Sequence, residues 1–205
     1  SLRQAAERPA LVAQAAGTAG GRTPAGLAVG SARDSMLLVA EPAPDQTLAG
    51  LDGRLEADDV LADAWRQLAA VHRAGLAHRS LDAGAVRVGA DGTAWLVGWD
   101  EGDLAVPDLT RRIDQAQLLT AAALAVGEAR AVAAARGALT PAELAALAPV
   151  LQSVVMPGPT RLALREHPDM LRRLRESIPG ELGGGGVEPM RLTRFSLATL
   201  VTVVL

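Results

Sequence analysis

Residues 68–88 read LAAVHRAGLAHRSLDAGAVRV, and residues 92–102 read GTAWLVGWDEG. The first stretch contains the end of a helix that we expect over Asp58–Ala74, because its apolar side chains recur at three- and four-residue steps. Gly75 offers a C-terminal stop for that helix. A polar loop follows and leads into the residues of a hairpin. This order of helix, loop and hairpin decides the fold of the chain.

Two hairpins are expected. One has the strands Val86–Val88 and Ala94–Trp99, and Asp91-Gly92 between them is a dipeptide that favours a tight hairpin turn. The other has the strands Leu27–Val29 and Met36–Ala40, which are short apolar runs separated by a turn-like segment. The predicted β structure is therefore small and local.

The rest of the chain predicts helices. Thr140 and Glu143 have the spacing of a capping box, and Pro141 between them suits the first helical position. The further helices are expected over Leu2–Ala16, Leu109–Val126, Glu128–Arg136, Pro141–Leu151 and Thr160–Ser177. The expected fold class is therefore α+β and mostly helical.

The composition excludes several kinds of chemistry. The chain of 205 residues has 20 basic residues, all of them arginine, and it has no cysteine. Without lysine there is no Schiff-base chemistry and no Walker-A lysine, and without cysteine there is no thiolate nucleophile or zinc–thiolate site. The net charge of −3 argues against a general nucleic-acid binder, since no basic excess exists to displace counterions.

The C-terminal part divides into a tether and an apolar run. Residues 179–190 contain GGGG and predict a flexible tether. Residues 191–205 begin with Arg191 and Arg194 and end in eleven uncharged residues; a membrane-spanning helix needs about 20, so we expect the truncated start of one. Arginines before the run predict a cell-membrane protein with residues 1–190 on the cytoplasmic side. A β-branched edge strand of a soluble domain is the alternative.

The loop after the long helix resembles the catalytic loop of the protein-kinase-like fold. That family has a His-Arg-Asp or His-Gly-Asp motif, an asparagine five residues after the aspartate, and a hairpin that ends in Asp-Phe-Gly. His78 and Arg79 match the first two loop positions, and Leu81 matches an apolar one. Trp99 stands where the phenylalanine would be. Asp114 matches an aspartate that, in the family, usually braces the loop.

The residues that would carry catalysis are replaced. Ser80 stands in place of the catalytic aspartate, Ala85 in place of the metal-binding asparagine, and Gly98 in place of the metal-binding aspartate. Phosphoryl transfer needs carboxylates that hold magnesium and orient the attacking hydroxyl. The resemblance therefore implies a pseudokinase domain over residues 1–178, rich in the C-terminal lobe and incomplete in the N-terminal lobe, with no catalytic residue and no metal site.

Two further carboxylates offer a fallback. Asp82 and Asp100 each lie two residues beyond a lost carboxylate, and as relocated ligands they would make the protein a divergent phosphotransferase for a small or lipid substrate. A shift of two residues on a strand end moves a side chain by about 6–7 Å, which favours the non-catalytic interpretation. No cofactor is expected, although ATP binding without catalysis stays open. The family's hinge, which holds adenine by its backbone, would fall at Glu41 and Ala43.

A wider resemblance covers the order of the elements. The later helices, the tether and the apolar run resemble actinobacterial membrane proteins that carry a cytosolic kinase-like domain ahead of a lysylphosphatidylglycerol synthase/flippase-like transmembrane region. The resemblance implies a non-catalytic regulatory or scaffolding domain on a polytopic membrane protein. Its partners would be its own transmembrane region and the membrane, reached through the segment after Leu205. It does not imply lysyl transfer.

Two alternatives stay open at this point. Arg172, Arg173 and Arg175 would contact anionic lipid headgroups, or they would form a solvated helix face that nearby acidic residues neutralise. The whole chain would alternatively be a soluble helical interaction domain whose likeness to kinases is a relic of the fold.

Overall fold

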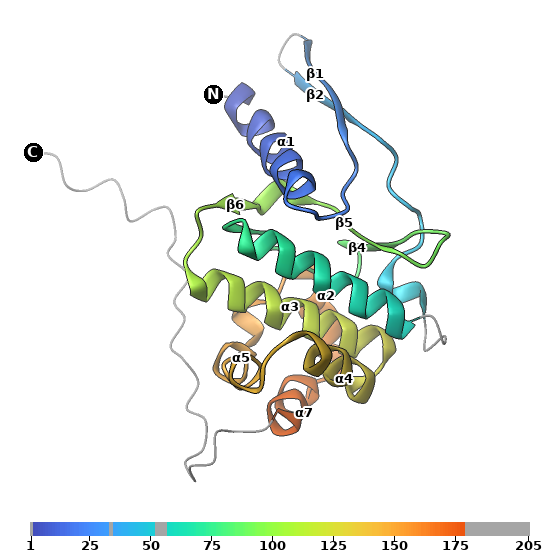
Figure 1. Ribbon diagram of the computed structural model, residues 1–205, viewed down its shortest axis with the longest axis vertical. Coiled ribbons are helices and arrows are strands. Elements are labelled where there is room, and N and C mark those ends of the chain that lie inside the picture. The colour runs from blue at the N-terminus through green and yellow to red at the C-terminus, as the bar shows by residue number, and fades with distance from the viewer. Residues whose placement is uncertain (1, 33–34, 52–56, 179–205) are drawn as a thin grey trace, which may run out of the picture.

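The computed structural model describes residues 2–32, 35–51 and 57–178. Helix α1 (Leu2–Thr18) and the hairpin of β1 (Gly26–Ala32) and β2 (Ser35–Ala40) lie side by side at one end of the molecule (Figure 1). The other helices form the larger part below them. The hairpin predicted from Leu27–Val29 and Met36–Ala40 is therefore confirmed. Its strands pair antiparallel from Gly26 opposite Ala40 to Ala32 opposite Ser35.

The centre of the larger part is α2 (Ala57–Arg73), which packs against α3 (Asp108–Val126) and α4 (Glu128–Ala138). Acidic residues lie in the first turn of α2 and basic residues in its last turn, as the helix dipole favours. Gly75 follows with a φ of +81°, a conformation that glycine adopts without strain. The predicted boundaries of α2 are therefore confirmed to within one residue.

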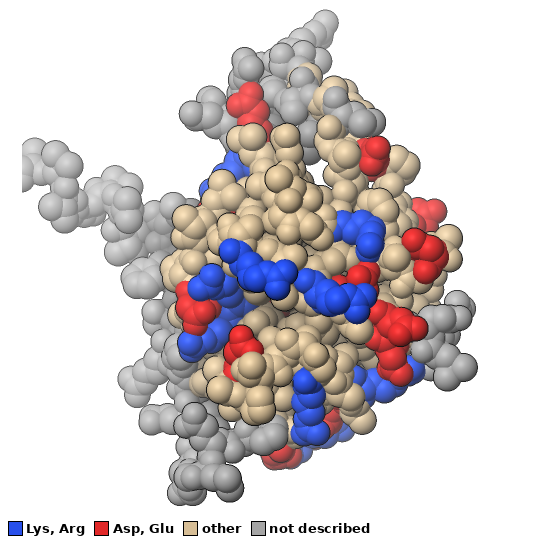
Figure 2. Space-filling view, in the orientation of Figure 1, with Lys and Arg blue, Asp and Glu red and all other residues tan. Residues whose placement is uncertain are grey.

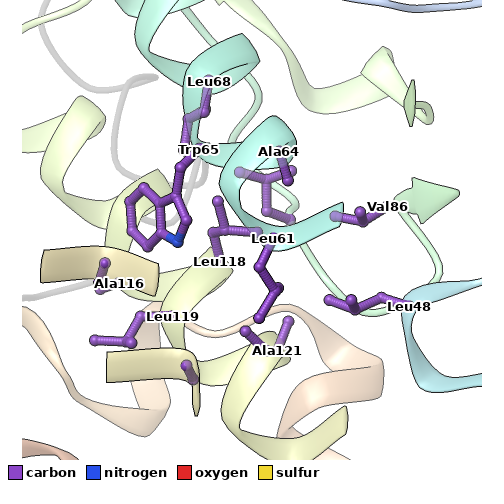
Figure 3. Packing of buried hydrophobic residues seen from close by; sticks show 14 of the residues in the cluster. Leu48, Leu61, Ala64, Trp65, Leu68, Val86, Ala116, Leu118, Leu119 and Ala121 are labelled. Atoms are coloured by element: carbon purple, nitrogen blue, oxygen red, sulfur yellow. The ribbon is translucent and has the colours of Figure 1, made fainter. Parts of the chain in front are cut away.

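The core is built mainly from leucine, alanine and valine, with Trp65 as its largest fully buried side chain. Trp65 and Leu61 project from α2 toward Leu118 and Leu119 of α3 (Figure 3). These four side chains are at most 1% exposed. The turn η1 (Leu48–Leu51) packs on α3, with Leu48 fully buried. A second buried indole, that of Trp99, belongs to the same cluster.

The hairpin predicted from Val86–Val88 and Ala94–Trp99 is present in shorter form. Strand β4 (Val86–Val88) pairs antiparallel with β5 (Ala94–Leu96). The prediction that the second strand reaches Trp99 is wrong, because Gly98 has a φ of +79° and starts the 3-10 turn η2 (Trp99–Glu101). A left-handed residue cannot continue an extended strand.

A third strand pair joins distant segments. The short strands β3 (Leu76–Ala77) and β6 (Asp103–Leu104) pair antiparallel. The sequence shows no signal for them, since two-residue strands have no periodicity. Their pairing ties the chain just after α2 to the chain just before α3.

Polar side chains of α2 hold the second hairpin in place. Asp63 Oδ2 accepts hydrogen bonds from the Ala94 amide and from Arg22 Nη1, both at 2.8 Å. Gln67 Nε2 donates to the Ala94 carbonyl at 2.6 Å. Both backbone groups of one strand residue are therefore satisfied by a single helix face, which fixes the hairpin on α2.

The C-terminal helices are shorter than predicted. The helix expected over Pro141–Leu151 ends at Ala145, because Pro149 has no N–H to donate to the Ala145 carbonyl. The helix expected over Thr160–Ser177 is divided by Pro168, which disfavours the helical conformation at the residue before it. The elements are α5 (Pro141–Ala145), η3 (Ala148–Val150), η4 (Ser153–Val155), α6 (Gly158–Glu166) and α7 (Met170–Ser177).

The predicted capping box at the start of α5 is confirmed in full. The Thr140 hydroxyl accepts from the Glu143 amide at 3.3 Å, and the Glu143 carboxylate accepts from the Thr140 amide at 2.8 Å. The described residues form a mostly helical α+β fold with three two-stranded sheets. None of their helices is long and apolar enough to cross a bilayer. The tether at 179–190 and the membrane segment at 191–205 lie outside the described residues.

Candidate functional site

A buried carboxylate holds the loop that the sequence singles out. Asp114 of α3 is fully buried. Its Oδ2 accepts from the backbone amide of His78 and its Oδ1 from that of Arg79, each at 2.7 Å. The Nε2 atom of His72 lies 3.1 Å from the same Oδ2. Three polar groups from two segments are thereby satisfied by one side chain, and the start of the loop is fixed.

A second residue of α3 completes this support. Gln117 Oε1 accepts from the Leu81 amide at 2.9 Å, and Gln117 Nε2 donates to the Val155 carbonyl at 2.6 Å. Arg79, between the two supports, has a φ of +68°, which is uncommon for a side chain of its size and depends on surrounding bonds. The sequence analysis did not select Gln117. Its signal is a polar residue three positions after Asp114 on a helix face that is otherwise apolar.

His78 connects the loop to the second hairpin. Its Nε2 lies 2.8 Å from the Val97 carbonyl and therefore carries the proton, since a carbonyl can only accept. The other ring nitrogen, Nδ1, accepts from the Ser80 amide at 3.4 Å. The imidazole also contacts the buried indole of Trp99, with ring centroids 4.5 Å apart. These contacts require a neutral ring and give His78 a structural role.

Burial lowers the pKa of His78 below its ordinary value of 6.5, although Asp114 and the Val97 carbonyl act in the opposite direction. The unfolded chain therefore binds a proton at His78 more readily than the folded chain does. The contribution of this residue to folding stability is fully present above about pH 6.5, and it is lost as the pH falls from there through the lowered pKa of the folded state. We expect the melting temperature to fall when the pH is lowered from about 7.5 to about 5.5, a range where only histidine side chains ordinarily titrate. The variant H78Q should show a distinctly smaller fall. An equal fall in both proteins would contradict this role.

Ser80, Ala85 and Gly98 lie in or beside this loop. Ser80 is half-buried, Ala85 is buried and Gly98 is exposed. The Val97 amide donates to the Ala85 carbonyl at 2.9 Å, which brings the end of the loop beside the residue before Gly98. Neither a methyl group nor a hydrogen atom can ligate a metal, so two of the three positions offer no metal ligand.

The two fallback carboxylates have different environments. Asp82 Oδ1 accepts from the amides of Gly84 and Ala85, both at 2.8 Å, so it caps a turn. Asp100 is exposed in η2. Both carboxylates act electrostatically on the His78 ring. Among the residues that the structure describes, no three His, Asp or Glu side chains converge in a way that could hold a metal ion.

The hinge candidates lie where the chain leaves β2. Glu41 is exposed, and its amide donates to the Ala25 carbonyl at 2.9 Å, which extends the hairpin by one bond. Ala43 is half-buried. The side chain of Glu41 also accepts from the Ala25 amide at 3.4 Å. The segment after β2 is therefore tied to β1 by both the backbone and the side chain of Glu41.

An exposed ionic contact joins α1 to the loop. Asp103 lies between Arg8 of α1, at 2.8 Å, and Arg79, at 3.5 Å. Next to it, α1 approaches Gly102 so closely that an added Cβ would lie 2.7 Å from Val12 Cγ1. The sequence analysis did not select Asp103, because only the pairing of β3 with β6 brings it beside Arg79.

The arginines of α7 have partners within the chain. Arg172 pairs with Asp169 and Glu176 at 3.1 and 3.0 Å. Arg173 lies 3.4 Å from Glu128, and Arg175 donates to the Leu151 carbonyl at 2.6 Å. Arg172 and Arg173 therefore have acidic partners and Arg175 a carbonyl partner, as on a partly neutralised helix face.

The chain matches no model of a protein family and no curated protein. Among solved structures, the kinase PK-1 of the Cydia pomonella granulovirus is similar to 45% of this chain, with 12% sequence identity and a TM-score of 0.39. The matched part covers 37% of that viral protein, so the chain spans well under half of its length. A likeness this weak says nothing of activity.

Proposed function

We propose that the chain is a kinase-like domain without phosphotransfer activity, which serves as a regulatory or scaffolding module on the cytosolic side of a polytopic membrane protein. The observation that carries the proposal is the loop from His78 to Ala85. It is braced by Asp114 at two backbone amides, while Ser80 and Ala85 stand where carboxylate and amide ligands would be needed. The scaffold of a catalytic loop is kept and its chemistry is missing.

The hydrogen bonds support a structural use of this loop. Asp82 Oδ1 accepts two backbone bonds of 2.8 Å within its own turn, which gives this carboxylate a structural role as a turn cap. His78 is fully buried and both of its ring nitrogens are engaged by backbone groups, Nε2 by the Val97 carbonyl and Nδ1 by the Ser80 amide, so neither nitrogen faces solvent as a general base would. A rigid loop with no reactive group suits a binding or regulatory domain.

The catalytic part of the proposal is tested with magnesium and labelled ATP on the full-length protein. We expect no transfer of the γ-phosphoryl group to protein, lipid or water above a heat-denatured control. Magnesium-dependent transfer that is lost in D82A or D100A would overturn the proposal and establish a divergent phosphotransferase. Nucleotide binding that needs no magnesium would agree with a non-catalytic domain, because the hinge at Glu41 and Ala43 is independent of the lost carboxylates.

The kinase-like part has a separate test. If Ala85 and Gly98 occupy ligand positions, the double variant A85N/G98D should gain a magnesium-dependent rise in melting temperature in the presence of ATP. Aspartate and asparagine tolerate the left-handed conformation better than other side chains, which keeps Gly98→Asp feasible. Two substitutions of the same chemistry at exposed positions, A90N and G137D, are the control. A magnesium-dependent rise in melting temperature in both A85N/G98D and the control, or in neither, would contradict the assignment of Ala85 and Gly98 to metal-ligand positions.

The membrane part is tested by fractionation. We expect the full-length protein to sediment with membranes. In intact cells, protease added from outside should leave residues 1–190 undigested, and it should digest them only after the membrane is permeabilised. A variant that ends at residue 190 should be released into the soluble fraction. Soluble behaviour of the full-length protein would favour the interaction-domain alternative and would leave the kinase-like test above unaffected.

A further inference from the structure

An open groove runs along the surface between α2 and α4. Its volume is about 920 Å³. It lies away from the loop that Asp114 braces and shares none of that loop's residues. Its charged lining consists of Arg66 and Arg73 of α2 and of Asp58, which pairs with Arg130 of α4 at 2.9 Å. Its apolar lining consists of Trp65 and the small residues Ala62, Ala69, Ala129, Ala133, Ala134, Gly137 and Ala138.

The α4 side of the groove has an unusual surface for an exposed helix. Ala129, Ala133 and Gly137 are exposed and lie four residues apart, so they form one uncharged stripe. An exposed helix face ordinarily carries charged and polar side chains. Without such side chains a further helix could approach to an interaxial distance of about 8 Å, at the short end of the usual range. The shape of the groove therefore suits a helix better than an irregular chain.

The α2 side of the groove carries cations at a regular spacing. Arg66 and Arg73 are seven residues apart on one helix face, which is about 10 Å along the axis. The Arg66 side chain is 70% exposed and has only an exposed contact to Asp63 at 3.1 Å. Arg73 is exposed, and within the part of the chain that the structure describes it makes no hydrogen bond or ion pair.

The basic character continues beyond the groove. A second hollow of about 600 Å³ shares Ala69, Arg73 and Ala138 with the first and reaches Arg111 and Arg112 at the start of α3. Figure 2 shows the resulting band of basic side chains across the middle of this face. Asp108 lines the same hollow and pairs with both Arg111 and Arg112. The cations that point to an acidic ligand are therefore Arg66 and Arg73 in the groove itself.

We propose that this groove binds an amphipathic α-helix of a partner protein. The partner helix presents small and aliphatic side chains to the alanine floor and carboxylates at positions i and i+7 to Arg66 and Arg73. Burial of the apolar stripe supplies affinity, and the two cations set orientation and the rate of association. An apolar floor between the cations favours such a helix over a nucleic-acid backbone or a flat lipid surface, which offer charge without an apolar ridge. The inference does not depend on the proposed kinase relationship.

The test uses a pair of labelled helical peptides of about 18 residues, long enough to follow α2 from end to end at roughly 1.5 Å per residue. Both have an alanine and leucine face. One carries glutamates seven residues apart and its twin carries glutamines at those positions. By fluorescence anisotropy with the whole chain, we expect the glutamate peptide to bind at least tenfold more tightly. The preference should shrink at high salt, because exposed charges are screened.

Variants of the groove separate charge from shape. The double variant R66E/R73E should lose at least tenfold in affinity for the glutamate peptide and little for its twin. A133Q should weaken both peptides, because its longer side chain fills the stripe, while the melting temperature stays unchanged. The matched control is R165E, an exposed arginine on α6, which should change neither affinity.

Three results would overturn the proposal. The first is no binding of either peptide, and the second is binding that R66E/R73E and A133Q leave unchanged. The third is binding of phosphatidylglycerol vesicles that R66E/R73E removes while peptide binding is absent, which would assign the basic band to the membrane surface instead.

Discussion

Replacing Asp114 by alanine is expected to lower the free energy of unfolding by about 3–5 kcal/mol, the usual cost of removing one member of a buried charged network. The carboxylate is fully buried and accepts from the amides of His78 and Arg79 at 2.7 Å. Without it, the buried amide of His78 loses its acceptor, at a cost of about 1–3 kcal/mol, and the partly buried amide of Arg79 loses its acceptor as well. Urea unfolding followed by circular dichroism measures the change.

Two variants make this prediction sharp. D114N keeps one oxygen acceptor in place and should cost less than D114A. D108N lies in the first turn of the same helix and removes an exposed carboxylate that pairs with Arg111 and Arg112, so it should cost less than about 1 kcal/mol. If D114A costs no more than D108N, the brace is not what holds the loop. Should D114A fail to fold, faster amide exchange at residues 78 and 79 in D114N provides the same information.

Replacing Trp65 by alanine is expected to cost about 3–5 kcal/mol, because the largest fully buried side chain of the described core would leave a cavity between α2 and α3. Circular dichroism is the appropriate probe of urea unfolding here, since the substitution removes a fluorescent reporter. The same change would also open the floor of the groove between α2 and α4, which Trp65 lines.

The matched variant W65F separates volume from polarity. The indole Nε1 of Trp65 is buried and has no hydrogen-bond partner among the described residues, and an unsatisfied buried donor costs about 1–3 kcal/mol. Phenylalanine removes that donor together with part of the ring, and the two effects oppose one another. We expect W65F to cost about 1 kcal/mol or less. A cost as large as that of W65A would mean that packing of the whole indole outweighs the unpaired donor.

Local signals carried most of the helix and hairpin predictions. The periodicity of Leu61, Trp65 and Leu68 identifies α2, and Asp91-Gly92 identifies the turn of the second hairpin, because both signals depend only on neighbours in the chain. The errors have local causes too. Pro149 and Pro168 end helices that apolar periodicity alone would continue, and the sequence shows these prolines without showing how far their effect extends.

The candidate site was partly visible in the sequence. The pattern around His78 singles out the loop, and a matching aspartate at 114 follows from the family resemblance. Gln117 and Asp103 were missed, because their roles depend on contacts with residues more than twenty positions away. Asp82 was selected from the sequence, and its turn-capping bonds to the amides of Gly84 and Ala85 are short-range.

The sequence by itself determined the mostly helical α+β class, the positions of the main helices and both hairpins, and the absence of lysine and cysteine chemistry. These follow from the order and type of residues within a few turns of one another. Only the tertiary structure decided that Asp114 satisfies two amides of the loop, that β3 pairs with β6, and that Arg66 and Arg73 border an alanine-lined groove. Each of these joins segments far apart in the chain, and their proximity arises when the helices pack to bury Trp65 and its aliphatic neighbours.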